Sequence, residues 1–590
     1  MAAKATPTQH DLPLRAARFP SLTEALEYAS RGDTGFNFYN GRGELYRRLP
    51  YSELCAEARL LGRKLIGLGH QPGDRMVLIA ETGPEFVRFF FACQYAGLVP
   101  VPVPAAVHLG GRDSYVHQLR KLLSSANPSL AMAPGEYISM LEEAGRHLEG
   151  AHIAGPDWFD RLEPVDCETH TPEAHDLAYL QYTSGSTRFP RGVMITQAAV
   201  MDNLRGILEH GMEMNETDRC VSWLPYYHDM GLVGLVLGPM ASQRSVDYIG
   251  TRDFAMRPRL WAKLIAESKA TISFSPPFGY ELCARRLRES DVEQLDLSSW
   301  RVAGVGAETI RPSSLENFST KLAAANFDPR AFLACYGMAE CSLAISFASL
   351  EQTMQVDHID SERLELTGEA LEIEAGSDHR ANQFVRCGRT IPGLELEVRD
   401  PAGNVLPQRQ CGIIFVRGAS VMTGYFSDPD TTAEVLSPDG WLNTGDMGYR
   451  VGDEVVVTGR QKDVIIVNGR NIWPQDLEHI AERQPEVRPE DASAFAVTDC
   501  DGADVAVMVV QCRTADPHLR AELAERLRSG IQQEFGIDCR VELVPPHTLP
   551  RTSSGKLSRS GARRDYLQRH GGKAPADNDV SASPEARVAG

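Results

Sequence analysis

A run of hydroxyl and glycine residues between Tyr182 and Val193 has the composition of a phosphate-binding loop. It reads Tyr-Thr-Ser-Gly-Ser-Thr-Arg-Phe-Pro-Arg-Gly-Val, and its candidate phosphate ligands are Thr183, Ser184, Gly185, Ser186 and Thr187. Hydroxyl groups, and the backbone amides of a turn that glycine allows, can donate several hydrogen bonds to the oxygens of a triphosphate. The Gly-x4-Gly-Lys-Ser/Thr pattern of nucleotide hydrolases is absent. A solvated linker is the alternative interpretation of such a run.

Two short predicted strands flank this run. Residues 177–181 and 193–195 are apolar enough to be buried strands, and Thr196 is placed to cap the helix that follows. A loop between two core strands has its ends positioned by those strands, which favours a binding loop over a linker.

Three later segments place polar residues at the ends of predicted strands. Residues 223–234 include His228, residues 304–308 read Gly-Val-Gly-Ala-Glu, and residues 332–340 end in Glu340. In open α/β sheets, ligands bind at the carboxyl ends of the strands. Each segment alone is also explained by a buried histidine, a tight turn or a capping glutamate. Their shared strand-then-turn placement indicates one site.

Helices and strands alternate along most of the chain. The apolar pattern predicts helices over residues 51–68, 84–96 and 261–267, and buried strands over 75–80, 98–103, 271–274 and 300–303. This alternation predicts the α/β class, with mostly parallel sheets covered by helices.

The C-terminal hundred or so residues have the pattern of a smaller α+β unit, which is a normal domain size. Residues 464–467 with Asn468-Gly469 predict a hairpin. Helices are predicted from residue 474 and over 519–535, and strands over 494–497, 505–512 and 541–544.

Composition limits the partners and the compartment. The 590 residues carry 60 basic and 79 acidic side chains, a net charge of −19, so the basic footprint of a nucleic-acid-binding protein is missing. The most apolar stretch, residues 89–103, is interrupted by polar residues and prolines, so we expect no stable membrane insertion. The twelve cysteines form no CxxC pair, which is typical of free thiols in the reducing cytoplasm.

Five motifs in a fixed order carry a family resemblance. They are Thr-Ser-Gly-Ser-Thr (183–187), Tyr-Gly-Met-Ala-Glu (336–340), Trp-Leu-Asn-Thr-Gly-Asp (441–446), Gly-Arg-Gln-Lys-Asp (459–463) and Ser-Gly-Lys (554–556). The set resembles the adenylate-forming enzymes, the superfamily of acyl-CoA synthetases, peptide-synthetase adenylation domains and luciferases. Residues 88–104, 226–231, 469–471 and 474–476 make the chain more narrowly similar to the fatty acyl-AMP ligases.

The resemblance implies a reaction and a domain arrangement. A fatty acid carboxylate would attack the α-phosphate of ATP in the presence of Mg²⁺, releasing pyrophosphate and leaving an acyl-adenylate. The acyl group would then pass to the phosphopantetheine thiol of an acyl carrier protein. Residues 1–460 would form the large adenylate-forming domain and 461–568 a small mobile lid. Residues 569–590, nearly devoid of apolar side chains, are predicted to be disordered.

The resemblance also assigns roles to single residues. Lys556 and His228 would be catalytic, Glu340 would hold Mg²⁺, and Lys462 would be the hinge. Besides the loop at 183–187, the nucleotide would contact Gly306, Ala307, Glu308, Tyr336, Gly337, Met338, Asp446 and Arg460. The acyl pocket would include Met230, Gly231 and Val233.

Three positions depart from the commoner family pattern. Arg188 stands where most relatives have a second glycine, Arg191 where they have a lysine, and Gln197 where they have a histidine. A guanidinium can bind phosphate through two parallel hydrogen bonds, so we interpret these positions as tolerated variation.

The stretch from 352 to 384 is acidic and has no clear strand pattern. A solvated surface insertion is one interpretation. The other is the extra segment of the fatty acyl-AMP ligases, which restrains the C-terminal domain and favours a carrier protein over CoA. An acyl-CoA ligase and a catalytically silent acyl or nucleotide binder remain the alternatives for the whole chain.

Overall fold

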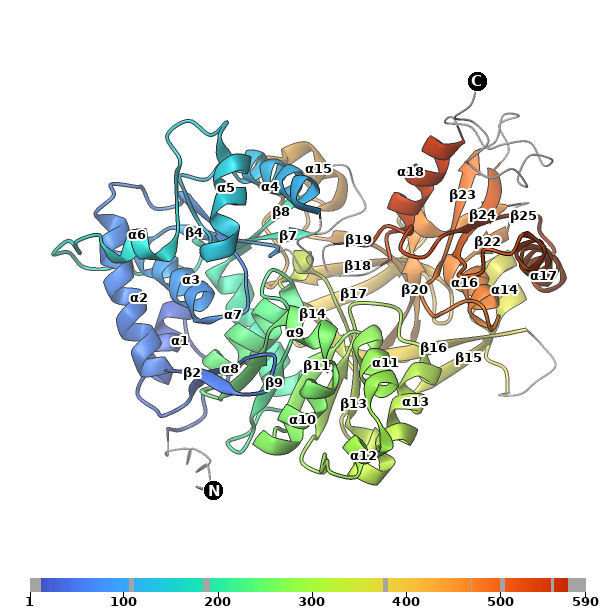
Figure 1. Cartoon of the computed structure of the whole chain (residues 1–590), viewed down its shortest axis with the longest axis horizontal. Helices are drawn as coiled ribbons and strands as arrows, with labels where there is room; N and C mark the ends of the chain where they lie inside the picture. Colours follow the sequence, from blue (N-terminus) through green and yellow to red (C-terminus); the bar gives the residue numbers. More distant parts are fainter. Residues whose placement is uncertain are drawn as a thin grey trace.

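A four-stranded parallel sheet forms near the N-terminus of this computed structural model, which describes residues 12–105, 111–183, 191–374, 380–467, 470–498, 504–552 and 557–570. Its strands, in order across the sheet, are β4 (Val99–Val103), β3 (Arg75–Ile79), β5 (Leu130–Met132) and β6 (His152–Ala154). The amphipathic helix α2 (Tyr51–Ile66) and the largely buried helix α3 (Pro84–Ala96) pack against each other beside it (Figure 1). The sequence pattern predicted these four segments of β3, β4, α2 and α3 to within two residues.

Fourteen strands of the described chain form a second, larger sheet. Its parallel part contains β1 (Gly35–Tyr39), β10 (Val246–Ile249), β9 (Cys220–Ser222), β11 (Ile272–Ser275), β12 (Val302–Val305) and β13 (Phe332–Gly337). Beyond β13 the pairing is antiparallel, through β14 (Ala344–Phe347), β16 (Ala381–Thr390), β20 (Glu454–Arg460), β19 (Leu442–Val451), β18 (Gly412–Gly418) and β17 (Leu394–Arg399). At the other edge, β2 (Leu45–Pro50) pairs antiparallel with β1. The predicted α/β class is confirmed, while the antiparallel part was not anticipated.

Helices α10 (Arg259–Ser268), α11 (Pro277–Arg286) and α13 (Pro312–Leu322) lie next to the parallel strands (Figure 1). Crossover connections of this kind place the carboxyl ends of β9, β11, β12 and β13 at one edge of the sheet. Among the described residues, no helix is both long and apolar enough to cross a membrane.

The two strands predicted on either side of the hydroxyl-rich run form a hairpin. Strand β7 (Leu177–Thr183) pairs antiparallel with β8 (Arg191–Thr196), and Thr183 lies opposite Arg191. The Thr196 hydroxyl accepts a hydrogen bond from the Ala199 amide at 3.2 Å, so it caps α7 (Gln197–Gly206) as predicted. Residues 184–190, including Ser184, Gly185, Ser186 and Thr187, lie outside the described residues.

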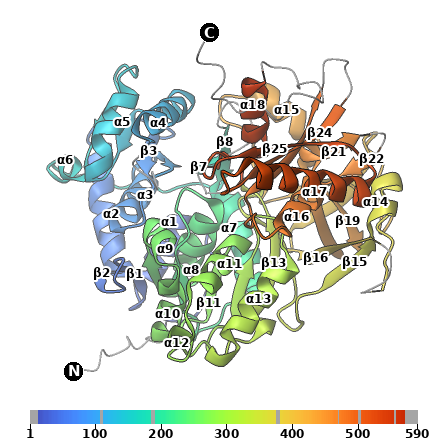
Figure 2. The same cartoon turned by 45° about the vertical axis from the view of Figure 1, so that its right-hand side comes forward.

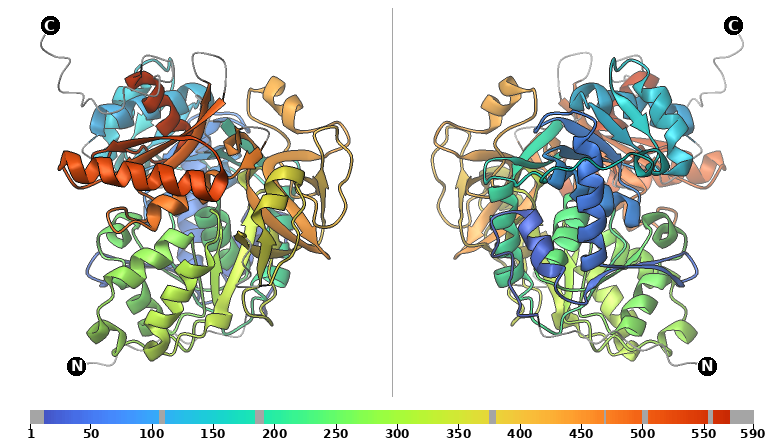
Figure 3. Two further views of the ribbon diagram at one scale, coloured as in Figure 1. Left: turned by 90° about the vertical axis from the view of Figure 1, so that its right-hand side faces the viewer. Right: turned by 90° about the vertical axis from the view of Figure 1, so that its left-hand side faces the viewer.

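The C-terminal region has its own apolar core. Its sheet consists of β23 (Ala492–Thr498), β24 (Asp504–Gln511) and β25 (Cys539–Val544). Helices α16 (Pro474–Glu482) and α17 (Pro517–Phe535) share the apolar core with this sheet, and α18 (Arg559–Arg569) is the last helix. The hairpin of β21 (Ile465–Val467) and β22 (Arg470–Ile472) precedes them. Figure 3 shows this region, in orange and red, beside the larger sheet. The predicted disordered tail begins too early, because Arg569 is the last residue of α18 and pairs with Glu542 of β25, and from 571 onward the tail lies outside the described residues.

Residues 352–384 are more ordered than the sequence suggested. They contain β15 (Val356–Asp360), which pairs with β16, and helix α14 (Ser361–Thr367). The interpretation as a solvated insertion without regular structure was wrong for these parts, because Asp357 and Glu365 are buried at 1% and 0% exposure. Figures 1 and 2 both show α14 beside the C-terminal region.

Candidate active site

A cleft of about 1170 Å³ lies between the large sheet and the C-terminal region. His228, Tyr336 and Asp446 line one side of it, from turns and strands of the large sheet. Gln475 and Arg559, from the first turns of α16 and α18, line the other side. The segments that the sequence singled out as strand-then-turn therefore meet at one cavity.

Asp446 has two partners in this cleft. The Tyr336 hydroxyl donates to its Oδ2 at 2.8 Å, and Arg460 Nε lies 3.0 Å from its Oδ1. Asp446 and Arg460 are paired residues of neighbouring strands β19 and β20, which fixes their contact. Burial raises the pKa of the Asp446 carboxyl, and the Arg460 guanidinium opposes that shift. Burial also holds the pKa of Tyr336 well above its usual value, so its hydroxyl remains a donor.

Glycines at the ends of β12 and β13 each lie close to the backbone of a neighbouring segment. A Cβ atom at Gly306 would lie 2.7 Å from the Cys335 carbonyl oxygen, and one at Gly337 would lie 1.9 Å from the Leu343 carbonyl oxygen. Ala307, Glu308, Gly337 and Met338 line the cleft, whereas Gly306 is buried behind them. Glycine is therefore required at both positions, because a neighbouring backbone leaves no room for a Cβ atom.

Glu340 is buried at the end of the turn after β13. Its Oε1 accepts a hydrogen bond from the Tyr425 hydroxyl at 2.8 Å, and burial raises the pKa of its carboxyl. The guanidinium of Arg191 lies 5.4 Å from the centre of the Tyr425 ring. Sequence reasoning missed Tyr425, because its partner is 85 residues away and no local pattern connects the two.

The chemistry of Glu340 fits Mg²⁺. Among the described residues, no group of three or more His, Cys, Asp or Glu side chains could hold a metal ion. Mg²⁺ does not need such a group, since it is usually bound by one or two carboxylates together with substrate phosphates. A single buried carboxylate in a turn that contacts β8, the strand after the hydroxyl-rich run, is consistent with that binding mode.

His228 lies in the turn between β9 and the π-helix η4 (Met230–Leu237). Its Nδ1 is 2.7 Å from Asp229 Oδ1, which orients the ring, and His228 lines the cleft. Of the predicted acyl-pocket residues, Met230 lines the cleft. Gly231 and Val233 are buried in the same π-helix, where Gly234 also lines the cleft.

Comparisons with known proteins identify the family. The family model "AMP-binding enzyme" matches residues 18–426, and the model "AMP-binding enzyme C-terminal domain" matches residues 469–564. The chain belongs to the AMP-binding enzyme family.

Two curated relatives and one solved structure cover nearly the whole AMP-binding enzyme. The "Putative acyl-CoA synthetase" of Caulobacter vibrioides is 46% identical over 563 residues, which are 95% of this chain and 98% of that protein. The medium-chain-fatty-acid–[acyl-carrier-protein] ligase JamA of Moorena producens is 30% identical over 93% of this chain and 95% of its own length. A structure from a study of fatty acyl-adenylate ligases of E. coli and L. pneumophila has a TM-score of 0.90 at 45% identity, covering 95% of this chain and 100% of that chain.

The AMP-binding enzyme is therefore an ATP-dependent, acid-activating ligase of the fatty acyl-AMP ligase type, which forms an acyl-adenylate. Lys556 lies outside the described residues, but its neighbours Thr552, Leu557 and Ser558 line the cleft. Lys462, in the turn after β20, also lines it, and burial together with Arg460 lowers the pKa of its amine. Gln197 is buried and bonded to Gln94 at 2.7 Å, away from the cleft.

Proposed function

We propose that this AMP-binding enzyme activates a fatty acid with ATP and Mg²⁺ and transfers the acyl group to the phosphopantetheine thiol of an acyl carrier protein. The observation that carries the choice of a carrier protein is the attachment of the C-terminal region to residues 352–384. The relative JamA, which is named as a ligase to acyl carrier protein, supports the same choice.

The side chains in the cleft would position the nucleotide and the acid. Asp446 would accept hydrogen bonds from the ribose hydroxyls, with Arg460 donating nearby. Ala307 and Tyr336 would pack against the adenine. Positioning and charge neutralisation dominate displacements at phosphorus, so little covalent work is left to the protein.

The reacting groups would be neutralised from two sides. His228 would donate to the acid carboxylate or the adenylate from the large sheet. Lys556 would bring a compact positive charge to the α-phosphate from the C-terminal region. Glu340 would hold Mg²⁺, which supplies charge neutralisation at the phosphates when bound.

Six residues attach the C-terminal region to the segment 352–384, and we call them the lid anchor. They are Glu365, Arg380, Asn382, Arg470, Trp473 and Asp476. Glu365 is paired with Arg380 and, at 2.8 Å, with Arg470 Nη2. Asn382 Nδ2 donates to Asp476 Oδ2 at 3.0 Å.

Apolar burial strengthens the lid anchor. Trp473 is 2% exposed and packs in one cluster with Leu364 of α14, Phe384 of β16 and Tyr449 of β19. The guanidinium of Arg380 lies 4.2 Å from the centre of the Phe535 ring at the end of α17. Rotation of the C-terminal region as a lid would have to break these contacts.

The lid anchor favours a carrier protein over CoA as the molecule whose thiol accepts the acyl group. We call the path by which a thiol would reach the acyl-adenylate the thiol channel. Free CoA offers little contact area outside this channel, whereas a folded carrier protein has a surface that can bind the rotated lid. A ligand shifts a conformational equilibrium only by the difference between its affinities for the two states. A carrier protein is larger than CoA, so its contact surface can supply a larger difference in affinity. The rotated lid is therefore more accessible with a carrier protein than with CoA.

An acyl-CoA ligase is the second candidate, and the 46% identity to the Caulobacter relative named as an acyl-CoA synthetase favours it. A silent binder is disfavoured by the coexistence of Asp446, Glu340 and His228 in one cleft.

The experiment offers the purified enzyme ATP, Mg²⁺ and dodecanoic acid, with free CoA in one reaction and a phosphopantetheinylated carrier protein in the other. Adenylate and thioester are followed by mass spectrometry. We expect adenylate in both reactions and thioester on the carrier alone. Efficient acyl-CoA formation would overturn the choice of carrier, and the absence of adenylate with every acid would overturn the proposed function.

A further inference from the structure

One group of the apolar residues that line the cleft comes from neighbouring segments of the chain. Six residues line this part of the cavity, and we call it the acyl arm: Ile207, Met212, Gly234, Leu343, Ala344 and Phe347. It lies between the π-helix η3 (Ile207–Gly211), the π-helix η4 and strand β14. None of the six side chains carries a charge, so the arm suits an alkyl chain.

The walls of the acyl arm are fixed by backbone contacts. The side-chain amide of Asn203 donates from Nδ2 to the Ala344 carbonyl oxygen at 2.8 Å, and its Oδ1 accepts from the Ala344 backbone N–H at 2.9 Å. These two hydrogen bonds connect β14 to α7. A Cβ atom at Gly211 would lie 2.5 Å from the Phe347 ring, so that ring packs directly on the backbone of η3. Walls held in this way give the arm a defined depth.

Met212 lines the arm from the protein interior. It has no solvent exposure although it lines the cavity, and the neighbouring Ile207 is 1% exposed, so this wall of the arm is closed to solvent. Its amide donates to the Ile207 carbonyl at 2.7 Å, which continues the wide turn of η3. π-helical turns of this kind occur frequently at functional sites.

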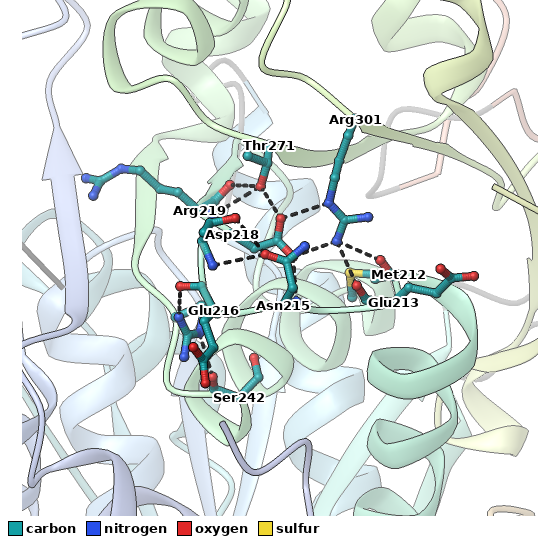
Figure 4. Close-up of polar contacts among 11 residues, drawn as sticks. Met212, Glu213, Asn215, Glu216, Asp218, Arg219, Ser242, Thr271 and Arg301 are labelled. Atoms are coloured by element: carbon teal, nitrogen blue, oxygen red, sulfur yellow. Dashed lines mark hydrogen bonds and ion pairs between the residues drawn. The ribbon is translucent and has the colours of Figure 1, made fainter. Parts of the chain in front are cut away.

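An ion pair between the partly exposed Arg301 and the buried Asp218 holds the backbone at Met212. Arg301 Nη2 donates to the carbonyl oxygens of Met212 and Glu213, each at 2.9 Å. Arg301 Nε also donates to Asp218 Oδ1 at 2.9 Å, and the side chain of Asp218 is fully buried. Figure 4 shows the guanidinium of Arg301 between Asp218 and these two carbonyls, with Thr271 on the other side of the carboxylate.

We propose that Met212, held in place by the Arg301–Asp218 pair, is the residue that sets the longest fatty acid this enzyme activates efficiently. The proposal rests on the proposed function, and it names Met212 as a specificity-determining residue and Arg301 as a positioning residue. Each methylene buried in an apolar arm contributes about fourfold to kcat/KM, since its burial is worth about 0.8 kcal/mol. A methylene that would collide with Met212 loses that contribution.

The test compares straight-chain fatty acids from six to eighteen carbons by pyrophosphate release, with Met212→Ala against the wild-type enzyme. Removing the thioether opens room for about two methylenes, so the optimum is expected to move to acids about two carbons longer. Met214→Ala is the matched control, because Met214 is also buried at 7% exposure, belongs to the same turn and is not among the cavity-lining residues. Its chain-length profile should equal the wild-type profile.

Gly234→Val supplies a change in the opposite direction. A Cβ atom at Gly234 would lie 3.3 Å from Leu343 Cδ2, so a larger side chain narrows the arm between η4 and Leu343. We expect kcat/KM for the longest accepted acids to fall about tenfold or more, while short acids stay within about threefold.

Arg301→Lys tests the positioning role. A lysine preserves the charge opposite Asp218 but cannot donate to both carbonyls in the geometry of the guanidinium fork. The chain-length profile should broaden, which a loss of stability alone would not cause. The proposal is overturned if wild-type enzyme activates fatty acids but Met212→Ala and Met214→Ala give the same profile. A wild-type enzyme that activates no acid would instead be a failure of the proposed function.

Discussion

The two oxygens of Asp446 already have different partners before any nucleotide binds. Oδ2 accepts from the Tyr336 hydroxyl and Oδ1 faces Arg460. Both contacts favour the ionised carboxylate, against the burial that raises its pKa. A buried carboxylate that remains ionised is a strong acceptor for two neighbouring hydroxyls, which is what a ribose offers.

Asp446→Asn should therefore weaken the use of ATP. The amide keeps one acceptor atom, but its NH2 group would face either the Tyr336 hydroxyl or the Arg460 guanidinium. A hydrogen bond to a charged group is worth about 1.5–3 kcal/mol, so we expect kcat/KM for ATP to fall about tenfold to a hundredfold. Asp453→Asn is the control, because that carboxylate is 66% exposed in its ion pair with Arg389. Equal kinetics in the two variants would argue against a ribose-binding role.

Residues in short motifs were predictable from sequence, and those defined by distant contacts were not. Tyr336 and Asp446 stand in motifs and lie together in the cleft, as expected. Met212 carries no local signal, because its place is set by Arg301, 89 residues further along the chain. A single sequence does not reveal such a partner.

At the scale of helices and strands, elements with a local sequence pattern were predicted, and elements that depend on distant contacts were missed. Helix α3 begins at Pro84 and ends at Ala96, as its apolar spacing and the following glycine predict. Strand β15 was missed, because its acidic residues resemble a solvated loop. The buried Asp357 carboxylate accepts a hydrogen bond from the Tyr449 hydroxyl at 2.7 Å. It also forms ion pairs with the guanidinium groups of Arg386 at 3.2 Å and Arg409 at 3.1 Å. Three partners more than 25 residues away thus allow a polar stretch to form a half-buried strand.

Helix α16 brings a second carboxylate, the half-buried Asp476, into the lid anchor. Burial raises its pKa to about 6, although the hydrogen bond from Asn382 and the charge of Arg380 oppose the shift, while Glu478 adds to it. The ordinary pKa is 3.8, so the folded state binds this proton more tightly than the unfolded state. The stability that depends on Asp476 is complete below pH 3.8 and is lost as the pH rises to about 6.

Asp476→Asn should stabilise the enzyme at neutral pH. The amide has the shape of the protonated acid and still accepts from Asn382. One pKa unit corresponds to about 1.4 kcal/mol, and partial exposure reduces the effect, so we expect a gain of about 1–2 kcal/mol at pH 7.5. Differential scanning fluorimetry would measure the difference in unfolding temperature between variant and wild type. That difference should shrink at pH 4.5, and a difference independent of pH would contradict the assigned pKa.

At the scale of the whole molecule, the groups that we propose to be catalytic come from two regions that each have their own core. Asp446, Glu340 and His228 belong to the large sheet, while Lys556 belongs to the C-terminal region, whose neighbouring residues line the opposite wall of the cleft. Under the proposed function, activity depends on how these two regions are held relative to each other. The lid anchor is one such link, and the ion pair of Arg311 with Glu482 of α16 is another.

Breaking the lid anchor should change which thiol is accepted. Glu365→Gln removes the carboxylate that faces both Arg380 and Arg470, and loss of one partner from a buried ionic group costs about 3–5 kcal/mol. The lid would then rotate without help from a carrier protein, so acyl-CoA formation should rise at least tenfold while pyrophosphate release with dodecanoic acid stays within about threefold. Glu369→Gln is the matched control, because Glu369 lies in the same segment and its ion pair with Arg363 is exposed at 40% and 51%. Hydrogen exchange at residues 470–472 would report whether the lid anchor has opened. If exchange rises in Glu365→Gln but acyl-CoA formation remains at the level of Glu369→Gln, attachment of the lid is not what excludes CoA, and selection must lie in the thiol channel itself.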